Sequence, residues 1–433
     1  FLLFDDLGYG QPTCYRSDSE FRTPSLDRLA SEGMRFTDAH SAAAVCTPTR
    51  YGVLTGRYPS RIGQFGVLTT YSPPIIPKTR MTVARLLHDQ GYHTACIGKW
   101  HLGLNWDGKP GNENAIPVGT PFRDGPLALG FDHFWGFTHA RNIGTVLAQE
   151  QVAENREAVD VQPLLTQKAV DYIGERAKSD QPFFLYLPVC PPHTPIVPAA
   201  EFVGQGGVNG NKKDSDYGDW LYQGDSILGR VMETLESHGL ADNTLLIASS
   251  DNGAERRAYE PLRGSKRSIY EGGHRVPFVA RWPGHIQPGA TCAATICLND
   301  LFATCADVID TPVPPDAAED SVSLLPLLTG TAELTRESTI HQSSSGDLAI
   351  RQGSSKLVFL KDGTRELYNL ETDLREDSSV LSAHEEVATK LSDRLQQLID
   401  NGRTTPGPTQ TNDAEITLEG SGGKRKKKNR QRQ

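Results

Sequence analysis

Short apolar segments alternate along most of this chain with longer segments whose apolar residues recur at helical spacing. The expected strands are 1–4, 92–97, 183–187 and 244–248, and the expected helices are 25–31, 81–90 and 217–238. Alternation of this kind is typical of a mainly parallel sheet with helices packed on its faces. We therefore expect an α/β fold, with a large domain built on a mixed, mostly parallel sheet flanked by helices.

The pattern changes near residue 330. Four short strands are predicted at 339–342, 348–352, 356–360 and 366–370, followed by a helix at 383–399. This order indicates a small C-terminal α+β lobe with an antiparallel sheet. Because single cores rarely grow beyond about 250 to 300 residues, two unequal domains are expected. The predicted units are a catalytic α/β domain over 1–330, an antiparallel-sheet subdomain over 331–403 and a disordered basic tail over 404–433.

Charge is unevenly distributed. The stretch 424–432 holds seven cations and no acid, so the formal net charge of −9 becomes −16 for residues 1–423. An acidic body argues against nucleic acid binding, because phosphate contacts need a basic face. The tail is expected to be a solvated end, with a weak anchor for polyanions as the alternative. No apolar run approaches the length of about 20 residues that spans a membrane.

The segment from Cys46 to Arg50 reads Cys-Thr-Pro-Thr-Arg, with Pro48 suited to the first turn of a helix. Amide groups of that turn would face an anion placed before it. A buried structural thiol at a helix start is the alternative. Near the end of the expected strand 92–97, Lys99 and His101 are two positions apart and project to the same side, which suits an anionic substrate. Seven cysteines show no zinc-type spacing, and their pairing stays open.

Acidic pairs follow two of the expected strands. Asp5-Asp6 and Asp251-Asn252 each come just after an apolar run, where open α/β sheets bind ligands. Neighbouring side chains on a strand point to opposite faces, so both carboxylates can share an ion only if the backbone bends, which we attribute to Gly8 and Gly10. Three carboxylates and an amide oxygen suit Ca²⁺, or Mg²⁺ as the alternative, and not zinc. Taken singly, both motifs are also common turns.

The runs 44–56 and 91–101 resemble the two signatures of the type I, formylglycine-dependent sulfatases, the arylsulfatase-like group of the alkaline phosphatase superfamily. The run 363–370 resembles a stretch near the C-terminus of many members, so the likeness covers about residues 1–400. It implies that a formylglycine-generating enzyme or an anaerobic sulfatase-maturing enzyme oxidises Cys46. It also favours calcium, held by Asp5, Asp6, Asp251 and Asn252, with residue 46 completing the metal site.

The resemblance implies a covalent mechanism. One hydroxyl of the hydrated aldehyde at position 46 attacks sulfur, with Arg50 holding the hydrate and Asp251 as the base. Lys99 and Lys266 neutralise the sulfate oxygens as charge develops.

The resemblance to the sulfatases also implies how the alcohol and the sulfate are released. His193, with Lys266, protonates the departing alcohol. His101 then takes the proton of the second hydroxyl, which expels sulfate from the covalent sulfated intermediate and restores the aldehyde. The family more often has glycine where Ser265 stands, which affects the expected loop shape and not the lysine.

A segment after the second signature is expected to form the substrate pocket through Trp135, His139 and Arg141. Phe-Trp-Gly-Phe at 134–137 resembles a family segment near the site, and the following residues look particular to this chain. Arg141 would bind a second sulfate or a uronate through paired hydrogen bonds. The alternative is a solvated surface arginine near a core tryptophan.

Sulfate ester hydrolysis on a carbohydrate is the expected function, and the family resemblance implies a periplasmic or extracellular location. A phosphonate or phosphodiester hydrolase of the same superfamily is one alternative, but its second metal pair is typically Asp-His, so Asn252 favours a sulfatase. A catalytically inactive protein that binds sulfated glycans is the other, and it predicts gaps in the set of catalytic residues that this sequence does not show.

Overall fold

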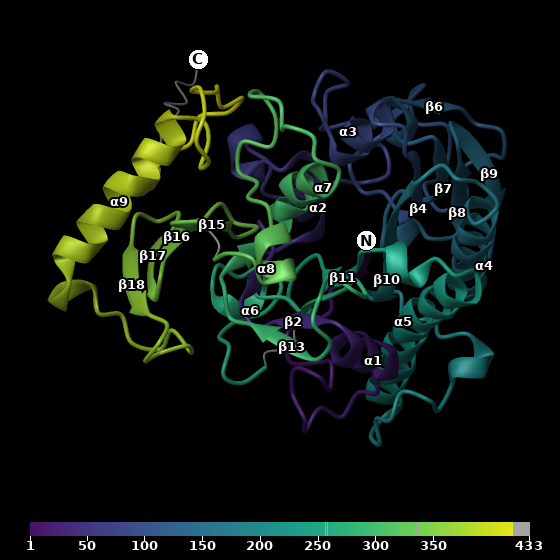
Figure 1. The fold of residues 1–433 in the computed structure, drawn as a ribbon, viewed down its shortest axis with the longest axis horizontal. Coiled ribbons are helices and arrows are strands. Elements are labelled where there is room, and N and C mark those ends of the chain that lie inside the picture. The colour runs from purple at the N-terminus through teal and green to yellow at the C-terminus, as the bar shows by residue number, and fades with distance from the viewer. Residues whose placement is uncertain (256, 258, 334–335, 419–433) are drawn as a thin grey trace, which may run out of the picture.

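A ten-stranded mixed sheet forms the centre of the molecule (Figure 1). The computed structural model describes residues 1–418, apart from residues 256, 258, 334 and 335. In spatial order the strands are β13 (Ala290–Cys292), β2 (Met34–Phe36), β12 (Phe278–Arg281), β11 (Leu246–Ser250), β1 (Leu2–Asp5), β10 (Phe183–Pro192), β4 (His93–Lys99), β7 (His133–Phe137), β8 (Thr145–Ala148) and β9 (Gln151–Asn155).

The five middle strands, β11, β1, β10, β4 and β7, all run parallel. Antiparallel pairs join β12 to β11 on one side and β8 to β7 on the other. The expected mixed, mostly parallel sheet is therefore confirmed. Because the middle strands share one direction, their carboxyl ends meet at a single edge of the sheet, where such folds bind ligands.

Helices cover both faces of this sheet. One apolar core lies between the sheet and α1, α4 and α5, and a second lies between the opposite face and α2, α3, α7 and α8. The bounds are α1 (Pro24–Glu32), α2 (Cys46–Thr55), α3 (Val83–Asp89), α4 (Ala158–Arg176), α5 (Lys212–Ser237), α7 (Leu301–Val308) and α8 (Leu325–Thr329). Helix α5 begins five residues before the expected start at 217, because the side chain of Asn211 caps it by accepting from the Asp214 amide.

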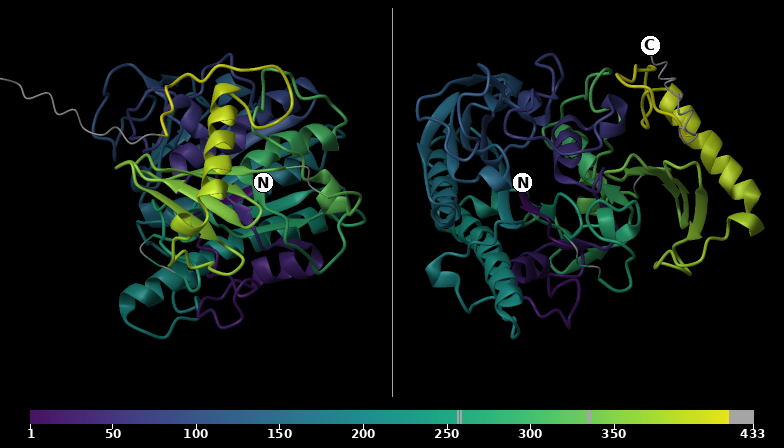
Figure 2. Two further views of the ribbon diagram at one scale, coloured as in Figure 1. Left: turned by 90° about the vertical axis from the view of Figure 1, so that its left-hand side faces the viewer. Right: turned by 180° about the vertical axis from the view of Figure 1, so that it is seen from behind.

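The four short strands near the C-terminus form an antiparallel sheet, as expected. They are β15 (Thr339–Gln342), β16 (Leu348–Gln352), β17 (Ser355–Phe359) and β18 (Arg365–Asn369). Helix α9 (Glu385–Asp400) lies across one face of this sheet (Figure 2) and packs Leu391 and Leu395 against Ile350 and Leu357. The remaining short elements are β3 (Ala39–His40), β5 (Asn105–Trp106), β6 (Phe122–Arg123), α6 (Glu271–His274) and β14 (Ile296–Cys297).

The expectation of a disordered tail from residue 404 is wrong for residues 404–418. The Thr404 amide donates to the Glu319 carbonyl at 3.1 Å, and the Asp413 amide donates to the Arg61 carbonyl at 2.8 Å. The Asp413 carboxylate also accepts from buried Arg57 at 2.7 Å. These contacts satisfy buried donors and acceptors of the main domain, which composition alone does not reveal. The seven-cation stretch lies outside the described residues.

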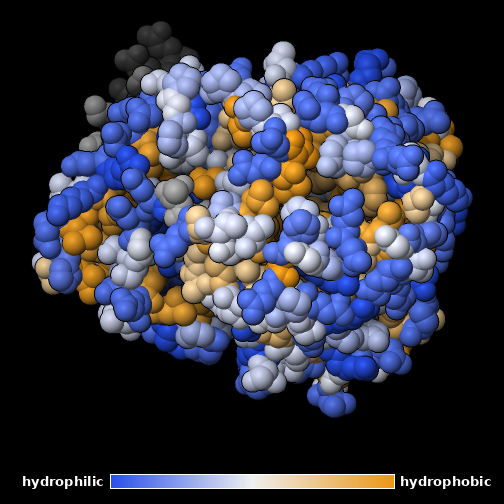
Figure 3. All heavy atoms as spheres, in the orientation of Figure 1, coloured by the Kyte–Doolittle hydropathy of each residue, from blue (hydrophilic) through white to orange (hydrophobic). Residues whose placement is uncertain are grey.

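The face seen in Figure 1 is mostly hydrophilic, with apolar side chains in scattered small groups (Figure 3). Among the residues that the structure describes, no helix is both long and apolar enough to cross a membrane. None of the seven cysteines, which all lie in the described residues, forms a disulfide bond, which answers the question of pairing that the sequence left open.

Candidate active site

The carboxyl ends of the five parallel strands carry almost all of the predicted site residues. These are Asp5 and Asp6 at β1, Lys99 and His101 at β4, His139 and Arg141 after β7, His193 after β10, and Asp251 and Asn252 after β11. The first turn of α2 brings Cys46 to the same edge. A cleft of about 430 Å³ opens there, and its lining includes Cys46, Lys99, His101, His139, Arg141, His193 and Lys266.

The bend that brings the two acidic pairs together occurs at Asp6. Its φ is +70°, in the left-handed region that a non-glycine residue rarely adopts. The Asp6 amide then donates to the Asp251 carboxylate at 3.1 Å, and the Asn252 side-chain amide donates to the Asp6 carboxylate at 2.7 Å. The expectation that Gly8 and Gly10 make this bend is therefore wrong, since neither has a positive φ. Strain of this kind is held in place by its surroundings and is common at functional sites.

Each carboxylate at the floor of the cleft has a cationic partner. Lys99 Nζ lies 2.5 Å from Asp5, and Lys266 Nζ lies 2.6 Å from Asp6. Arg50 donates twice to one oxygen of Asp251, at 2.7 and 3.1 Å. Burial alone would raise the pKa of Asp5, but the combined charges of Lys99, His193, Arg50 and Lys266 outweigh it and hold that pKa well below its usual range. The floor is thus a buried network in which loss of any one charge leaves its partner uncompensated.

Two buried oxygens of this network have no hydrogen-bond partner, Asp5 Oδ1 and Asn252 Oδ1. Ligand atoms of Asp5, Cys46 and Asp251 lie within 4.8 Å of one another. Orphaned acceptors inside a protein are costly unless a cation or donor satisfies them. The oxygen atoms of Asp5, Asp6, Asp251 and Asn252 are hard donors, and with two of them unsatisfied this set fits Ca²⁺ or Mg²⁺.

Cys46 is the first residue of α2 and is buried at the floor of the cleft. Burial raises the pKa of its thiol, and the nearby charges of Lys99 and Lys266 do not reverse this. The residue therefore carries a neutral thiol, which is a poor nucleophile. The turn that holds it is fixed by Thr47, whose hydroxyl donates to the His101 carbonyl at 3.0 Å, and by Arg50, which donates to the Lys99 carbonyl at 3.1 Å.

Two histidines flank the cationic residues of the floor. His101 also has a positive φ, of +58°, and its Nε2 lies 3.0 Å from the Leu68 carbonyl while its buried Nδ1 has no partner. His193 Nε2 lies 3.7 Å from the Asp6 carboxylate. Burial lowers the pKa of both imidazoles, with Lys99 adding to the effect at His101. Both rings are therefore neutral near pH 7 and present a nitrogen that accepts a proton.

The outer wall only partly matches expectation. Trp135 is 4% exposed and packs in the apolar core beneath α4 and α5, so the prediction that it lines the pocket is wrong. It belongs to β7, where alternate side chains point to opposite faces of the sheet. His139 and Arg141 follow that strand and do line the cleft. His139 Nε2 lies 2.8 Å from the Thr70 hydroxyl, and burial with the charge of Lys99 lowers the pKa of His139 to about 4.

Four further charged or polar residues line the cleft and were not predicted as site residues, namely Thr69, Glu113, Arg267 and Ser344. Glu113 lies in the Gly- and Pro-rich stretch 105–125, whose length is typical of binding loops but whose sequence singles out no residue. Arg267 adjoins Lys266 and pairs with Glu255 at 2.8 Å. Ser344 follows β15, so the small sheet contributes to the cleft, and nothing in the sequence near 344 indicates this.

Comparisons with known proteins agree with this geometry. The family model described as "Sulfatase" matches residues 1–311, and the model described as "N-sulphoglucosamine sulphohydrolase, C-terminal" matches residues 264–401. An N-acetylgalactosamine-6-O-sulfatase of Bacteroides thetaiotaomicron is 31% identical over 92% of this chain and 92% of its own length. Human arylsulfatase A is 33% identical over 89% of this chain and 79% of its own length.

The structure agrees with the sequence comparison. A solved structure from a study of glycosaminoglycan metabolism by Bacteroides thetaiotaomicron matches with a TM-score of 0.82 and 28% identity, covering 92% of this chain and 98% of that one. The family model matches well over half of the chain, and it includes both signatures and the strand ends that form the cleft. The chain therefore belongs to the sulfatase family, as a type I sulfatase of the alkaline phosphatase superfamily, and is a sulfuric ester hydrolase.

Proposed function

We propose that the chain hydrolyses a sulfate ester of a carbohydrate, using Cys46 in the form of formylglycine as the nucleophile. The observation that carries this proposal is the position of Cys46, at the first turn of α2 and at the floor of the cleft between Lys99 and Lys266. The unmodified side chain is a buried neutral thiol, which cannot attack an anionic ester efficiently. A hydrated aldehyde at the same place supplies two hydroxyl groups, one for attack and one for release.

The charges of the floor suit an anionic ester. Three carboxylates are paired with three cations, so the described floor is close to neutral. Asp5, Asp6, Asp251 and Asn252 would hold a divalent ion, with residue 46 completing the set. When bound, a calcium ion supplies positive charge for the sulfate oxygens and the attacking hydroxyl. The site would then carry net positive charge, which favours a sulfate ester over a neutral ester.

In the proposed attack, a hydroxyl oxygen of residue 46 forms a bond to sulfur while the bond from sulfur to the carbohydrate oxygen breaks. Asp251 accepts the proton of the attacking hydroxyl, and Arg50 keeps that carboxylate in place through its two hydrogen bonds. Lys99 and Lys266 neutralise the charge that develops on the sulfate oxygens. Both ammonium groups are already held by Asp5 and Asp6, so they need little rearrangement during the reaction.

Release of the two products uses the other side of the cleft. His193, with Lys266, gives a proton to the departing carbohydrate oxygen, since a bound sulfate beside the imidazole favours its charged form. His101 then accepts the proton of the second hydroxyl through its unpartnered Nδ1. Closure of the aldehyde breaks the bond to the sulfated oxygen and frees sulfate, and water regenerates the hydrate.

A carbohydrate substrate is supported by the wall of the cleft. Glu113, Arg141, Arg267 and Ser344 offer hydrogen bonds and charges to sugar hydroxyls and to further acidic groups. The bacterial relative named N-acetylgalactosamine-6-O-sulfatase points to the same chemical class. We also propose a formylglycine-generating or anaerobic sulfatase-maturing enzyme as a partner, and a periplasmic or extracellular location.

The substrate class is tested with a panel of sulfated mono- and oligosaccharides, a sulfated sterol, and a phosphonate monoester. We expect at least one sulfated carbohydrate to release sulfate, and we expect its kcat/KM to be the highest of the panel. Faster turnover of the phosphonate would favour the alternative hydrolase of this superfamily. Preference for the sterol would overturn the carbohydrate assignment and leave the sulfatase chemistry intact.

A further inference from the structure

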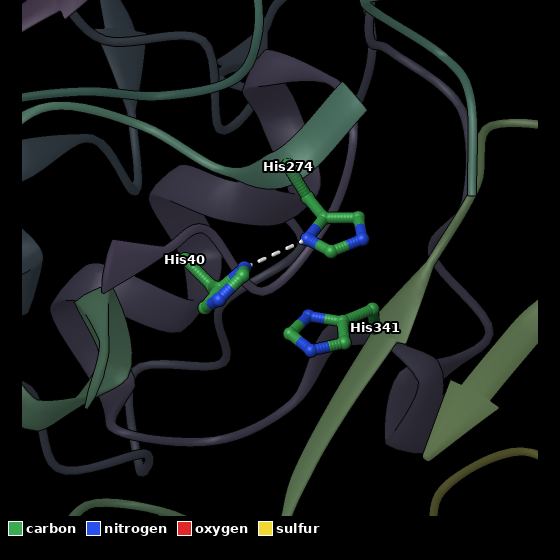
Figure 4. Close-up of side chains that lie close together, drawn as sticks. All are labelled: His40, His274 and His341. Atoms are coloured by element: carbon green, nitrogen blue, oxygen red, sulfur yellow. Dashed lines mark hydrogen bonds between the residues drawn. The ribbon is translucent and has the colours of Figure 1, made fainter. Parts of the chain in front are cut away.

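Three histidines from distant parts of the chain meet in a buried cluster outside the cleft. His40 ends β3, His274 ends α6 and His341 lies in β15, and each side chain is fully buried. Figure 4 shows the three rings facing one another, with a hydrogen bond between His40 and His274. One ligand nitrogen from each ring lies within 4.8 Å of the other two. None of the three belongs to the catalytic set of the proposed function.

We propose that His40, His274 and His341 bind a divalent transition-metal ion through their Nδ1 atoms, with zinc as the expected occupant. Neutral imidazole is a preferred ligand for zinc, whereas calcium and magnesium prefer oxygen. The Nδ1 atoms of His40 and His274 are 3.0 Å apart, close to the separation of about 3.3 Å between two nitrogens on tetrahedral zinc. Burial lowers the pKa of all three rings, so each is present in the neutral form that binds metal.

The hydrogen bonds of the opposite ring nitrogens support this assignment. His40 Nε2 lies 2.9 Å from the Asp38 carboxylate, and His274 Nε2 lies 3.1 Å from the Ile269 carbonyl. His341 Nε2 lies 3.1 Å from the Thr339 hydroxyl. Each metal-binding histidine commonly donates its second N–H to a carboxylate or carbonyl in this way. The 3.0 Å contact between the Nδ1 atoms of His40 and His274 is a hydrogen bond only in the tautomer that places a hydrogen on one of them. With hydrogens on the Nε2 atoms, both Nδ1 atoms are acceptors that repel unless a cation lies between them.

His341 supplies the most direct sign of a missing partner. Its Nδ1 is buried and has no hydrogen bond. The ring now stacks on that of His274, with centroids 4.0 Å apart, so it must tilt to share an ion with the other two. Thr339 is the one hydrogen-bond partner shown for this ring in the described residues, so the tilt breaks at most that hydrogen bond.

A metal-free arrangement is the competing explanation. Arg351 lies 3.2 Å from His40 Nε2 and Lys356 lies 3.1 Å from His274 Nε2, so both cations could donate to these nitrogens. Both cations have carboxylate partners as well. Arg351 pairs with Asp38 at 2.8 Å, and Lys356 pairs with Glu271 at 3.0 Å and Glu376 at 2.8 Å. The cations therefore do not need the imidazoles as acceptors.

The ion would join the small sheet to the segments that carry the catalytic residues. His40 precedes Cys46 by six residues, His274 follows Lys266 by eight, and His341 comes from β15 of the small sheet. Because the three ligands are fully buried, the metal has a structural role, in which binding energy adds to folding stability.

Zinc binding is measured by elemental analysis on the intact protein after dialysis against zinc. Excess calcium is kept present so that the oxygen-lined site is filled. We compare the unchanged protein with His341→Gln and, as a matched control, with His384→Gln, which alters an exposed histidine. The expected result is one zinc per chain in the unchanged protein and the control and none in His341→Gln, with a zinc-dependent rise in Tm that the variant lacks. Equal zinc content in all three proteins, or none in the unchanged protein, would overturn the proposal.

A second measurement covers the case in which His341→Gln does not fold. The unchanged protein is loaded with Co²⁺ in the presence of calcium, and intense visible absorption of a four-coordinate, nitrogen-ligated ion is expected. Asp38→Asn should then weaken Co²⁺ affinity by about 10- to 100-fold, since it replaces the carboxylate behind His40 with a neutral amide, whose oxygen is a weaker acceptor. Weak absorption typical of six-coordinate Co²⁺ would contradict the site.

Discussion

The floor and the wall of the cleft are built in different ways. At the floor, Asp5, Lys99 and Asp251 lie at the ends of parallel strands of the central sheet, are fully buried, and are held by charged partners. On the wall, Arg141 and Arg267 are exposed and lie in the connections between strands, Arg141 in a short 3-10 helix and Arg267 in a turn. The end of a strand fixes where its side chains lie, because the strand is held by its neighbours in the sheet. Loops can differ in sequence and length without disturbing the sheet. We therefore place the proposed sulfatase chemistry at the floor, and we expect the wall to determine substrate choice.

Loss of the proposed nucleophile should have the largest effect. We expect Cys46→Ala to lower kcat by about 10⁴-fold or more, as removal of a catalytic nucleophile does elsewhere. Cys14→Ser, which alters a half-buried thiol far from the cleft in sequence, serves as the control and should keep its rate. Initial rates on a small aryl sulfate provide the measurement. A Cys46→Ala protein with more than a tenth of the original rate would show that the floor works without this residue.

Breaking a charge pair of the floor should cost stability as well as rate. Lys99→Met leaves the Asp5 carboxylate buried without its partner, and we expect a loss of about 3–5 kcal/mol in the free energy of unfolding by urea. Added calcium should reduce that loss, because a cation at Asp5 replaces part of the missing charge. The control Lys212→Met removes an exposed partner of Asp216 and should change little. Similar losses for both variants would contradict the contrast between buried and exposed pairs.

Truncation tests whether the contacts of residues 404–418 with the main domain stabilise the protein. Removing residues 404–433 takes Asp413 from Arg57, which lies just past the far end of α2 from Cys46. We expect a fall of about 1–3 kcal/mol in stability from the loss of this partner, since buried Arg57 then keeps only Glu319, at 3.4 Å, as its carboxylate partner. A shorter deletion of residues 419–433 should leave Tm and turnover of a small sulfate ester unchanged. If the two deletions gave the same Tm, the contacts of residues 404–418 would make no measurable contribution to stability.

The smallest expected effect is at the wall. Arg141→Ala should raise KM for a polysulfated sugar by about tenfold, roughly the 1.4 kcal/mol of a charged hydrogen bond, and should leave kcat on a small aryl sulfate unchanged. Trp135→Phe is the matched control, since that residue lies in the core beneath the same wall. It should lower Tm without changing KM. An Arg141→Ala enzyme with unchanged KM on all polyanionic sugars would remove this residue from the substrate site.

The difference between floor and wall also explains what the sequence could predict. The floor followed from local patterns, because an apolar strand ending in Asp-Asp or Asp-Asn places polar groups at a sheet edge. The bend at Asp6 and the role of residues 404–418 did not, since both depend on contacts far apart in the chain. Trp135 was misplaced because its prediction came from the resemblance of residues 134–137 to a family segment near the site, which does not tell which side chains of the strand face the core. Ser344 and the three-histidine cluster arise only when the small sheet packs on the large domain.

The central claim is that the group reacting at the floor is formylglycine made from Cys46. It is tested by mass spectrometry of the proteolytic peptide that contains residue 46, on preparations made with and without a maturing enzyme, with turnover measured on the same samples. We predict that specific activity rises in proportion to the aldehyde-containing fraction of that peptide and is near zero when only thiol is found. Full turnover in a preparation whose peptide carries only the Cys46 thiol would contradict the account.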